Sequence, residues 1–279
     1  RHPGLRGNFR RLVQRSLNPG PWPVWVFVLL LLCAAWPAGV VHAQDKKCAV
    51  VLMHGKWGNT QYISFFGRKI EPTCTVKTLE MPWSQRRAYD ADYPAALQEI
   101  AAQVQTFRTQ GYQRVLLVGH SFGANAAMAY MAEVGDADGV IALAPGHSPL
   151  NMYGRNIGRE AVDKARELVA AGKAGESLSM DDLNQGQRRS IRMPAGVLLS
   201  YFDPQGVGEM SATAPRFKKP VPFMWVIGTA DPLFRGGEAY AWNKAPAHPQ
   251  SQYLVVTADH AGTPDVAVAQ VLEWIQKLE

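Results

Sequence analysis

The chain has 279 residues, of which 47% are hydrophobic, and a formal net charge of +6 at pH 7. Five of its 29 basic residues, all arginines, precede residue 44, and the remainder of the chain balances 24 basic against 23 acidic residues. Because the excess positive charge belongs to the first segment, the composition gives no ground for a nucleic-acid-binding domain. The residues after that segment suffice for one domain of the larger kind.

Residues 1–43 have the pattern of a secretory signal peptide. Arginines make a basic start, residues 24–36 form an apolar run of 13 residues, and small residues lead to Ala43. Such a run is shorter than a membrane-spanning helix requires. We therefore predict cleavage after Ala43 and an exported protein, either periplasmic or secreted. The alternative is an uncleaved leader, which would be the only part of the chain in contact with a membrane.

Two cysteines follow the leader, Cys48 and Cys74, each at the start of a predicted strand. An even number of cysteines in an exported chain indicates a disulfide. On the chain-entropy model, closing a loop of this size stabilises the fold by roughly 3–4 kcal/mol. Two buried free thiols are the alternative.

From Cys48 to residue 143, apolar runs of strand length alternate with helical patterns. Strands are expected at 48–53, 74–81, 115–118 and 139–143, and helices at 61–70, 93–109 and 124–132. In the helix at 93–109 the apolar residues share one face, and Gly111 supplies the stop. Strands that alternate with helices imply a mostly parallel sheet with helices on both faces.

Residues 145–194 break this alternation. One amphipathic helix, with apolar residues from Ile157 to Val169 and a stop at Gly172, is followed by a polar stretch. We interpret the segment as a small helical cap inserted above the sheet, within a single domain at 44–279. Further strands are expected at 197–202, 223–227 and 253–256, and a closing helix at Thr263-Pro264.

The segment Gly119-His120-Ser121-Phe122-Gly123 lies between a buried strand of valine and leucine and an alanine-rich helix. A G-x-S-x-G turn in that setting is the pattern of a nucleophile elbow, in which a strained turn presents the serine hydroxyl above the strand ends. Glycines two residues to either side keep Cβ atoms out of the crowded turn. The context makes Ser121 the candidate nucleophile. The alternative is a small residue in a tight turn.

Four elements together resemble the α/β-hydrolase family, over essentially all of residues 47–279. They are His54-Gly55 after the first strand, the turn at Ser121, Gly228-Thr-Ala-Asp231 after a late strand, and Asp259-His260 after the last strand. The resemblance is to a small exported serine esterase or lipase. It implies a three-layer α/β fold, a serine nucleophile, most often ester hydrolysis, and the order nucleophile, acid, histidine along the chain.

The chemistry of acyl transfer gives roles to Ser121, Asp231 and His260. A serine hydroxyl is a weak nucleophile until an imidazole accepts its proton, and a carboxylate must orient that imidazole and stabilise its charged form. Asp231 and His260 each lie just past a predicted strand. Asp203, also followed by proline, is the alternative acid. Asp259 ranks below both, because it would point away from the neighbouring ring.

Two further sets of residues are expected near the nucleophile. The backbone N–H of Phe122 and that of Lys56 or Trp57, with Lys56 preferred, would donate hydrogen bonds to the oxyanion. The aromatic side chains of Trp57, Tyr153 and Phe234 follow strands and would line an apolar substrate pocket.

The remaining histidines and the acidic residues show no metal-ligand spacing, so no metal and no cofactor are expected. His120 is expected to pack beneath the nucleophile, and His54 to brace the loop that carries the oxyanion donor. His147 lies beside the predicted site and is expected on the surface, with contact to substrate as the alternative.

The predicted function is hydrolysis of a small-molecule carboxylic ester through an acyl-enzyme intermediate, with no nucleic-acid partner. An amidase or an acyltransferase on the same triad is one alternative, because leaving group and access of water are not visible in the sequence. A catalytically inactive hydrolase-fold binding protein is another, although no member of the predicted triad is missing.

Overall fold

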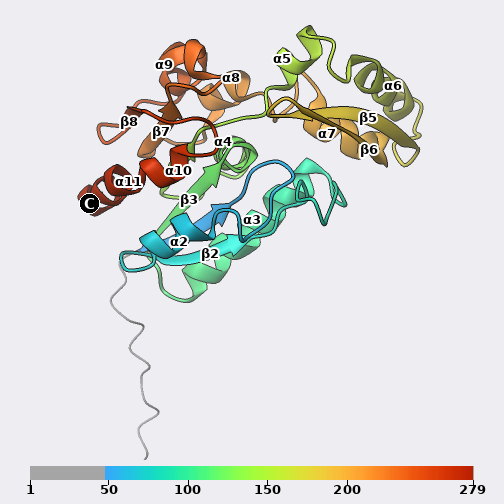
Figure 1. Cartoon of the computed structure of the whole chain (residues 1–279). Helices are drawn as coiled ribbons and strands as arrows, with labels where there is room; N and C mark the ends of the chain where they lie inside the picture. The colour runs from blue at the N-terminus through green and yellow to red at the C-terminus, as the bar shows by residue number, and fades with distance from the viewer. Residues whose placement is uncertain (1–47, 279) are drawn as a thin grey trace, which may run out of the picture. The chain divides into compact units, whose positions relative to one another are not determined.

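A computed structural model describes residues 48–278, all within the unit that spans residues 43–279. Within this range the central sheet has six parallel strands in the order β2-β1-β3-β4-β7-β8 (Figure 1). The strands are β1 (Cys48–Met53), β2 (Thr75–Leu79), β3 (Arg114–His120), β4 (Gly139–Leu143), β7 (Phe223–Gly228) and β8 (Gln252–Val256). The parallel α/β fold expected from the sequence is confirmed.

The strands at the centre of the sheet are buried on both faces. In β1, Val51 and Met53 pack into one hydrophobic core, whereas Val50 and Leu52 pack into a second core. Successive side chains of a strand point to opposite faces, so the two cores lie on opposite sides of the sheet. The apolar composition of β1 follows from this double coverage.

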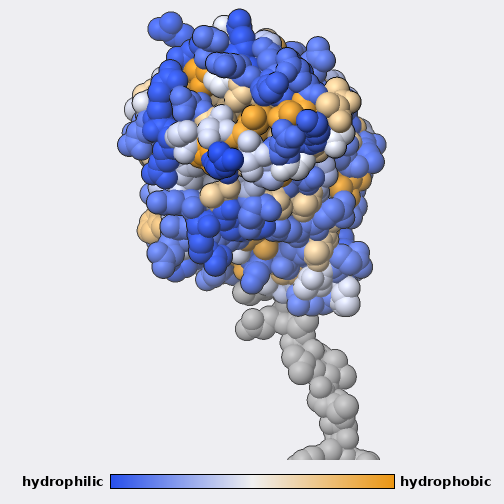
Figure 2. Space-filling view, turned by 90° about the vertical axis from the view of Figure 1, so that its right-hand side faces the viewer, coloured by the Kyte–Doolittle hydropathy of each residue, from blue (hydrophilic) through white to orange (hydrophobic). Residues whose placement is uncertain are grey.

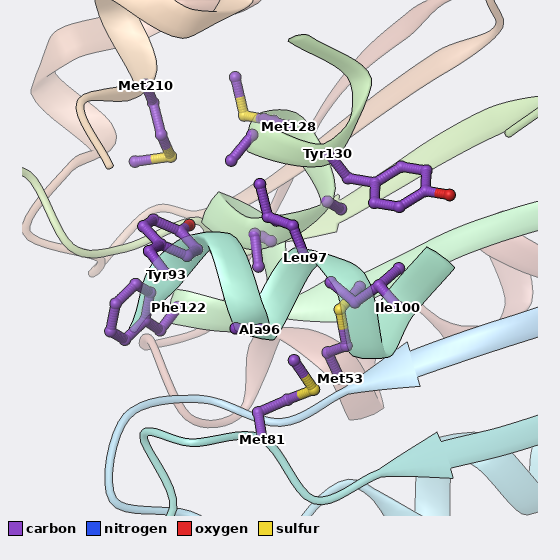
Figure 3. Close-up of a cluster of buried hydrophobic side chains, with 14 of the residues drawn as sticks. Met53, Met81, Tyr93, Ala96, Leu97, Ile100, Phe122, Met128, Tyr130 and Met210 are labelled. Carbon is purple, nitrogen blue, oxygen red and sulfur yellow. The ribbon is translucent and has the colours of Figure 1, made fainter. Parts of the chain in front are cut away.

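Helices complete the outer layers. The first core includes α3 (Tyr93–Thr109) and α4 (Phe122–Glu133), and the second includes α2 (Ser64–Ile70) and α11 (Val268–Lys277), which follows α10 (Thr263–Val266). In the first core, Leu97 and Ile100 of α3, Met128 of α4 and Met53 of β1 belong to one cluster (Figure 3). Helices on both faces of one sheet give the three layers that the family resemblance implies.

Helix α3 begins and ends at the residues that the sequence predicts. Oδ1 of Asp92 accepts a hydrogen bond from the N–H of Ala95 at 2.8 Å, and Pro94 lies in the first turn. A side-chain acceptor here satisfies one of the N–H groups that have no partner inside the helix. Gly111, with φ of +90°, follows the helix end.

The segment between β4 and β7 contains helices and an antiparallel hairpin. Its elements are α5 (Pro149–Gly154), α6 (Arg159–Ala170), β5 (Ser177–Asn184), β6 (Gln187–Pro194), α7 (Ala195–Phe202) and α8 (Met210–Thr213). The expected cap helix is α6, but the polar stretch after it forms the hairpin, so the cap is not purely helical. Gln185 and Gly186 make the two-residue turn, both with positive φ.

The surface on the side of α6 and the β5–β6 hairpin is largely hydrophilic, with smaller hydrophobic areas between the polar residues (Figure 2). The hairpin strands are rich in charged residues, and Arg188, Arg189 and Arg192 are exposed. Because β-branched and aromatic residues, the usual signal for a strand, are nearly absent there, the sequence did not indicate the hairpin.

The strand expected at 197–202 is wrong, because these residues belong to helix α7. Ala195, Leu198, Tyr201 and Phe202 are its buried residues, at helical spacings of three and four. A short apolar run fits either a buried strand or a buried helix, and periodicity does not separate the two. As a result, Asp203 follows a cap helix and not a strand of the sheet.

Cys48 and Cys74 form a disulfide, with Cα atoms 4.8 Å apart. Cys48 begins β1, Cys74 directly precedes β2, and these two strands pair in the sheet. The signal peptide predicted for residues 1–43 lies outside the described residues and stays a prediction. Among residues 48–278, no helix combines the length and the apolar character needed to cross a membrane.

Candidate active site

Ser121 occupies a strained turn between β3 and α4. Its φ of 55° and ψ of −115° lie in a region that residues with a side chain rarely adopt. The N–H of Ser121 donates to the carbonyl of Leu143 at the end of β4 at 3.0 Å. A Cβ at Gly146 would lie 2.7 Å from Oγ of Ser121, so the glycine leaves space beside the hydroxyl. This is the geometry of a nucleophile elbow.

The fold brings the three predicted triad residues together from positions far apart in the chain. Nε2 of His260 lies 2.8 Å from Oγ of Ser121. Nδ1 of the same ring lies 2.6 Å from Oδ2 of Asp231. Ser121 and Asp231 are buried, and His260 lies in the loop after β8. Both distances are within the range of good hydrogen bonds.

The hydrogen bonds around His260 define which ring nitrogen carries the proton. The carboxylate of Asp231 can only accept, so Nδ1–H donates to it and Nε2 is free to accept from the serine hydroxyl. Oδ1 of Asp231 accepts from the N–H of Leu233 at 2.8 Å, which fixes the carboxylate. The arrangement can remove a proton from Ser121 and stabilise the imidazolium that results.

The two other candidate acids lie apart from the imidazole. Oδ1 of Asp203 is 2.7 Å from Nη2 of Arg166 in the cap. Asp259 accepts from the N–H of Gly262 at 2.7 Å. Neither carboxylate has a hydrogen bond to His260 in this structure, whereas Asp231 has one.

The loop after β1 lies directly against the nucleophile. A Cβ at Gly55 would meet Cβ of Ser121 at 3.0 Å. The N–H of Trp57 donates to the carbonyl of Trp83 at 2.8 Å and is therefore engaged. The backbone N–H groups of Lys56 and Phe122 form no hydrogen bond with the described part of the chain. Of the two donors considered in this loop, the geometry favours Lys56.

Two buried histidines lie next to this centre. Nε2 of His54 accepts from the N–H of Met81 at 3.0 Å, and its Nδ1 lies 2.8 Å from the carbonyl of Gly55. His54 thus braces the loop after β1, and burial lowers its pKa. Nε2–H of His120 donates to the carbonyl of His260 at 2.9 Å, so His120 holds the backbone of the loop that carries the imidazole.

His120 makes the stability of the fold depend on pH. Burial lowers its pKa from 6.5 to about 4. Between these values the unfolded chain binds more protons than the folded chain, so stability is complete above pH 6.5 and decreases as pH falls toward about 4. On going from neutral pH to about pH 4.5, we expect this residue to remove roughly 2–3 kcal/mol. Urea unfolding of the wild type and His120→Gln at both pH values measures the difference. Equal losses in the two proteins would contradict the prediction.

Ser121 borders two adjacent cavities. The larger, of about 490 Å³, is lined by polar residues of the site and by apolar residues that include Met152, Met210 and Leu233. The smaller, of about 180 Å³, lies beside it and shares Ser121, Lys56 and the hairpin tip at 184–185. A substrate bound at the serine therefore has space on two sides.

Of the three aromatic residues expected at the substrate pocket, one lines a cavity beside Ser121 and two do not. Trp57 lines the smaller cavity, with Cζ of Arg189 4.5 Å from its ring centroid. The hydroxyl of Tyr153 donates to Asp163, and its ring lies under cap arginines. Neither Tyr153 nor Phe234 lines either cavity. A position in a loop after a strand does not determine where the side chain points. The ring of Tyr153 packs against residues of the cap instead of lining a cavity.

Two further parts of the site, His147 and the hairpin tip, differ from what the sequence indicates. His147 was expected on the surface, but its ring stacks on Phe122 at 4.1 Å and borders the larger cavity. Nε2–H of His147 donates to the carbonyl of Tyr201, and burial, with a smaller effect of Lys56, places its pKa well below the usual value. The hairpin tip was missed as well. A polar residue before glycine at 185–186 was the available signal for its turn.

Groups that could bind a metal are absent from residues 48–278, where no three His, Cys, Asp or Glu side chains cluster suitably.

Comparisons with known proteins bear on the fold and the family. No curated protein matches the sequence. Among solved structures, the chain is similar to one described with LipS and LipT, two metagenome-derived lipolytic enzymes (15% identity, TM-score 0.58, covering 84% of this chain and 95% of that one). It is also similar to the Paleococcus ferrophilus monoacylglycerol lipase (18% identity, TM-score 0.58, covering 82% of this chain and 94% of that one). A third similar structure is Est1E from Butyrivibrio proteoclasticus with ferulic acid bound (15% identity, TM-score 0.56, covering 82% of this chain and 88% of that one). At these identities the likeness concerns the fold.

The family itself follows from a second comparison. The model of the alpha/beta hydrolase family matches residues 50–276, which is most of the chain. The match spans the elbow, both loops that carry the acid and the histidine, and every strand of the central sheet except the first residues of β1. The chain belongs to the alpha/beta hydrolase family.

Proposed function

We propose that the protein is a serine hydrolase that cleaves carboxylic esters through an acyl-enzyme intermediate. Membership of the family supports an enzyme of the hydrolase kind. The observation that carries the finer proposal is the pair of hydrogen bonds from His260, one to Ser121 at 2.8 Å and one to Asp231 at 2.6 Å. A hydroxyl, an imidazole and a carboxylate in this order are the parts that nucleophilic acyl transfer requires.

In the first step, Oγ of Ser121 attacks the ester carbonyl while Nε2 of His260 takes its proton. The carboxylate of Asp231 stabilises the imidazolium. The N–H groups of Phe122 and Lys56 are the proposed donors to the oxyanion, each worth on the order of 3 kcal/mol. His260 then protonates the departing alcohol, and the acyl group remains bonded to Ser121.

In the second step, water replaces the alcohol. His260 takes a proton from the water while the hydroxide that forms adds to the acyl carbonyl. As the second tetrahedral intermediate collapses, the bond to Oγ breaks, His260 returns the proton to Oγ of Ser121, and the acid is released. His260 lines the larger cavity, so alcohol and water bound in that cavity would lie beside the imidazole. The reaction needs no cofactor.

We also propose that the protein acts outside the cytoplasm, after removal of residues 1–43. The disulfide between Cys48 and Cys74 supports export, because structural disulfides persist in oxidising compartments. The substrate would be a small-molecule ester, since the two cavities have volumes of about 490 and 180 Å³.

A series of nitrophenyl esters of rising acyl length tests the proposal. We expect turnover by the wild type, and a decrease of about 10⁴- to 10⁶-fold in kcat for Ser121→Ala, because the nucleophile is lost. Turnover that persists in Ser121→Ala would exclude an acyl-enzyme on this residue. Folded wild-type protein that turns over none of the esters would favour a binding function.

A further inference from the structure

Lys56 forms a buried ion pair with the cap. Its Nζ lies 2.6 Å from Oδ1 of Asp182, and the two side chains are 5% and 0% exposed. The same ammonium donates to the carbonyl of Leu183 at 3.3 Å. The other carboxylate oxygen of Asp182 accepts from the hydroxyl of the buried Tyr89 at 3.1 Å. The loop after β1 is therefore joined to strand β5 by charge-assisted hydrogen bonds.

The backbone of Lys56 is held by the same strand. Nδ2 of Asn184 donates to the carbonyl oxygen of Lys56 at 3.1 Å. Three consecutive residues of β5 thus contact this one residue of the loop. On the following residue, the N–H of Trp57 is held by the carbonyl of Trp83 at 2.8 Å. The peptide group between Lys56 and Trp57 is therefore held at both its carbonyl and its N–H.

An ion pair in this position is not explained by stability alone. Burying two charges has a large desolvation cost, and an apolar pair of similar volume is often equally stable or more stable. The ion pair fixes the position of the loop after β1 relative to strand β5 of the cap. The segment that it defines lies against Ser121. Lys56 lines the larger cavity, and its backbone N–H forms no hydrogen bond with the described residues.

We infer that Asp182, together with Asn184, is a positioning residue for the oxyanion site: the β5–β6 hairpin holds Lys56 so that its backbone N–H keeps its place beside Ser121. The inference rests on the proposed function. The cap would then contribute to the rate of the chemical step, in addition to lining the cavities, although none of its residues forms a bond with the reacting atoms. A displacement of about 1 Å can lower a rate about 10²-fold, so small movements of this loop matter.

Asp182→Asn tests the inference, with Asp181→Asn as its matched control. Asp181 precedes Asp182 on the same strand, but its side chain is exposed. For Asp182→Asn we expect kcat to decrease about 10- to 100-fold with KM within about twofold, because the oxyanion is stabilised in the transition state and not in the bound ester. The pH at half-maximal kcat should stay as in the wild type, since the triad is untouched. Asp181→Asn should match the wild type in all three quantities.

A double variant separates positioning from stability. Asp182→Asn combined with Lys56→Met leaves no buried charge without a partner, so it should regain most of the melting temperature lost by Asp182→Asn. We expect its kcat to remain low. Recovery of kcat together with melting temperature would overturn the inference, as would wild-type kcat in Asp182→Asn.

If Asp182→Asn does not fold, Asn184→Ala provides the test, because it removes the hydrogen bond to the carbonyl of Lys56 and leaves the buried ion pair in place. A lower kcat supports positioning, whereas an effect confined to KM overturns it and indicates contact with substrate. Failure of the proposed function has a different signature, because the wild type would then show no turnover that depends on Ser121.

Discussion

Asp231→Asn should decrease kcat by about 10⁴-fold with little change in the fold, because an amide can hold the imidazole in the wrong tautomer. In the structure, Nδ1–H of His260 donates to the carboxylate of Asp231 at 2.6 Å. An asparagine NH₂ in that position would donate to Nδ1 and shift the proton to Nε2, the atom that must accept from Ser121. Steady-state kinetics on a nitrophenyl ester, with circular dichroism to verify folding, measure the effect.

Asp203→Asn is the matched control for this prediction. Asp203 also precedes a proline, but its carboxylate pairs with Arg166 of the cap at 2.7 Å and is partly exposed. We expect its kcat to stay within about threefold of the wild type, since a surface ion pair is worth about 1 kcal/mol or less. Loss of turnover in Asp203→Asn, with activity retained in Asp231→Asn, would show that the acid is misassigned.

Gly119→Ala should have the largest effect on stability, and we expect a loss of at least about 3 kcal/mol, or no folded protein at all. A Cβ at this position would lie 2.0 Å from the carbonyl carbon of Gly123 and 2.4 Å from the N of Ala124. These are backbone atoms of α4, so no side-chain rotation can relieve the clash. The helix would have to move away from the end of β3, and the elbow would lose its shape.

Gly154→Ala provides the control for the same substitution. Nothing lies within 4 Å of the Cβ that it would add. We expect its free energy of unfolding to equal or slightly exceed that of the wild type, because alanine restricts the unfolded chain. Urea unfolding of both variants gives the comparison. A Gly119→Ala protein as stable as Gly154→Ala would show that α4 does not pack so closely on β3.

The sheet could be predicted because each of its central strands is an apolar run of strand length. Val115–Val118 is covered on both faces, and this environment leaves a signal in a single segment. The elbow was predictable for a related reason, since the steric demand of one turn imposes glycine at Gly119 and Gly123 within a few residues of Ser121. Local constraints of this kind can be recognised without knowledge of the rest of the chain.

The cap was predicted poorly because its structure depends on contacts with the body of the domain. Residues 197–202 form a helix in contact with α6, and nothing within the run itself distinguishes that from a buried strand. The burial of Asp182 depends on Lys56, which is 126 residues away along the chain. His147 packs against Phe122 and donates to the carbonyl of Tyr201, from two further segments. Such long-range partners have no local pattern.

Labelling with a fluorophosphonate, followed by mass spectrometry of the peptides, tests the reactivity of Ser121 most directly. The account predicts one adduct, on Ser121, that forms on folded wild-type protein and decreases strongly in His260→Ala, because the imidazole must take the proton of the attacking hydroxyl. A folded wild-type protein without an adduct, or with its adduct on a different residue, would contradict it.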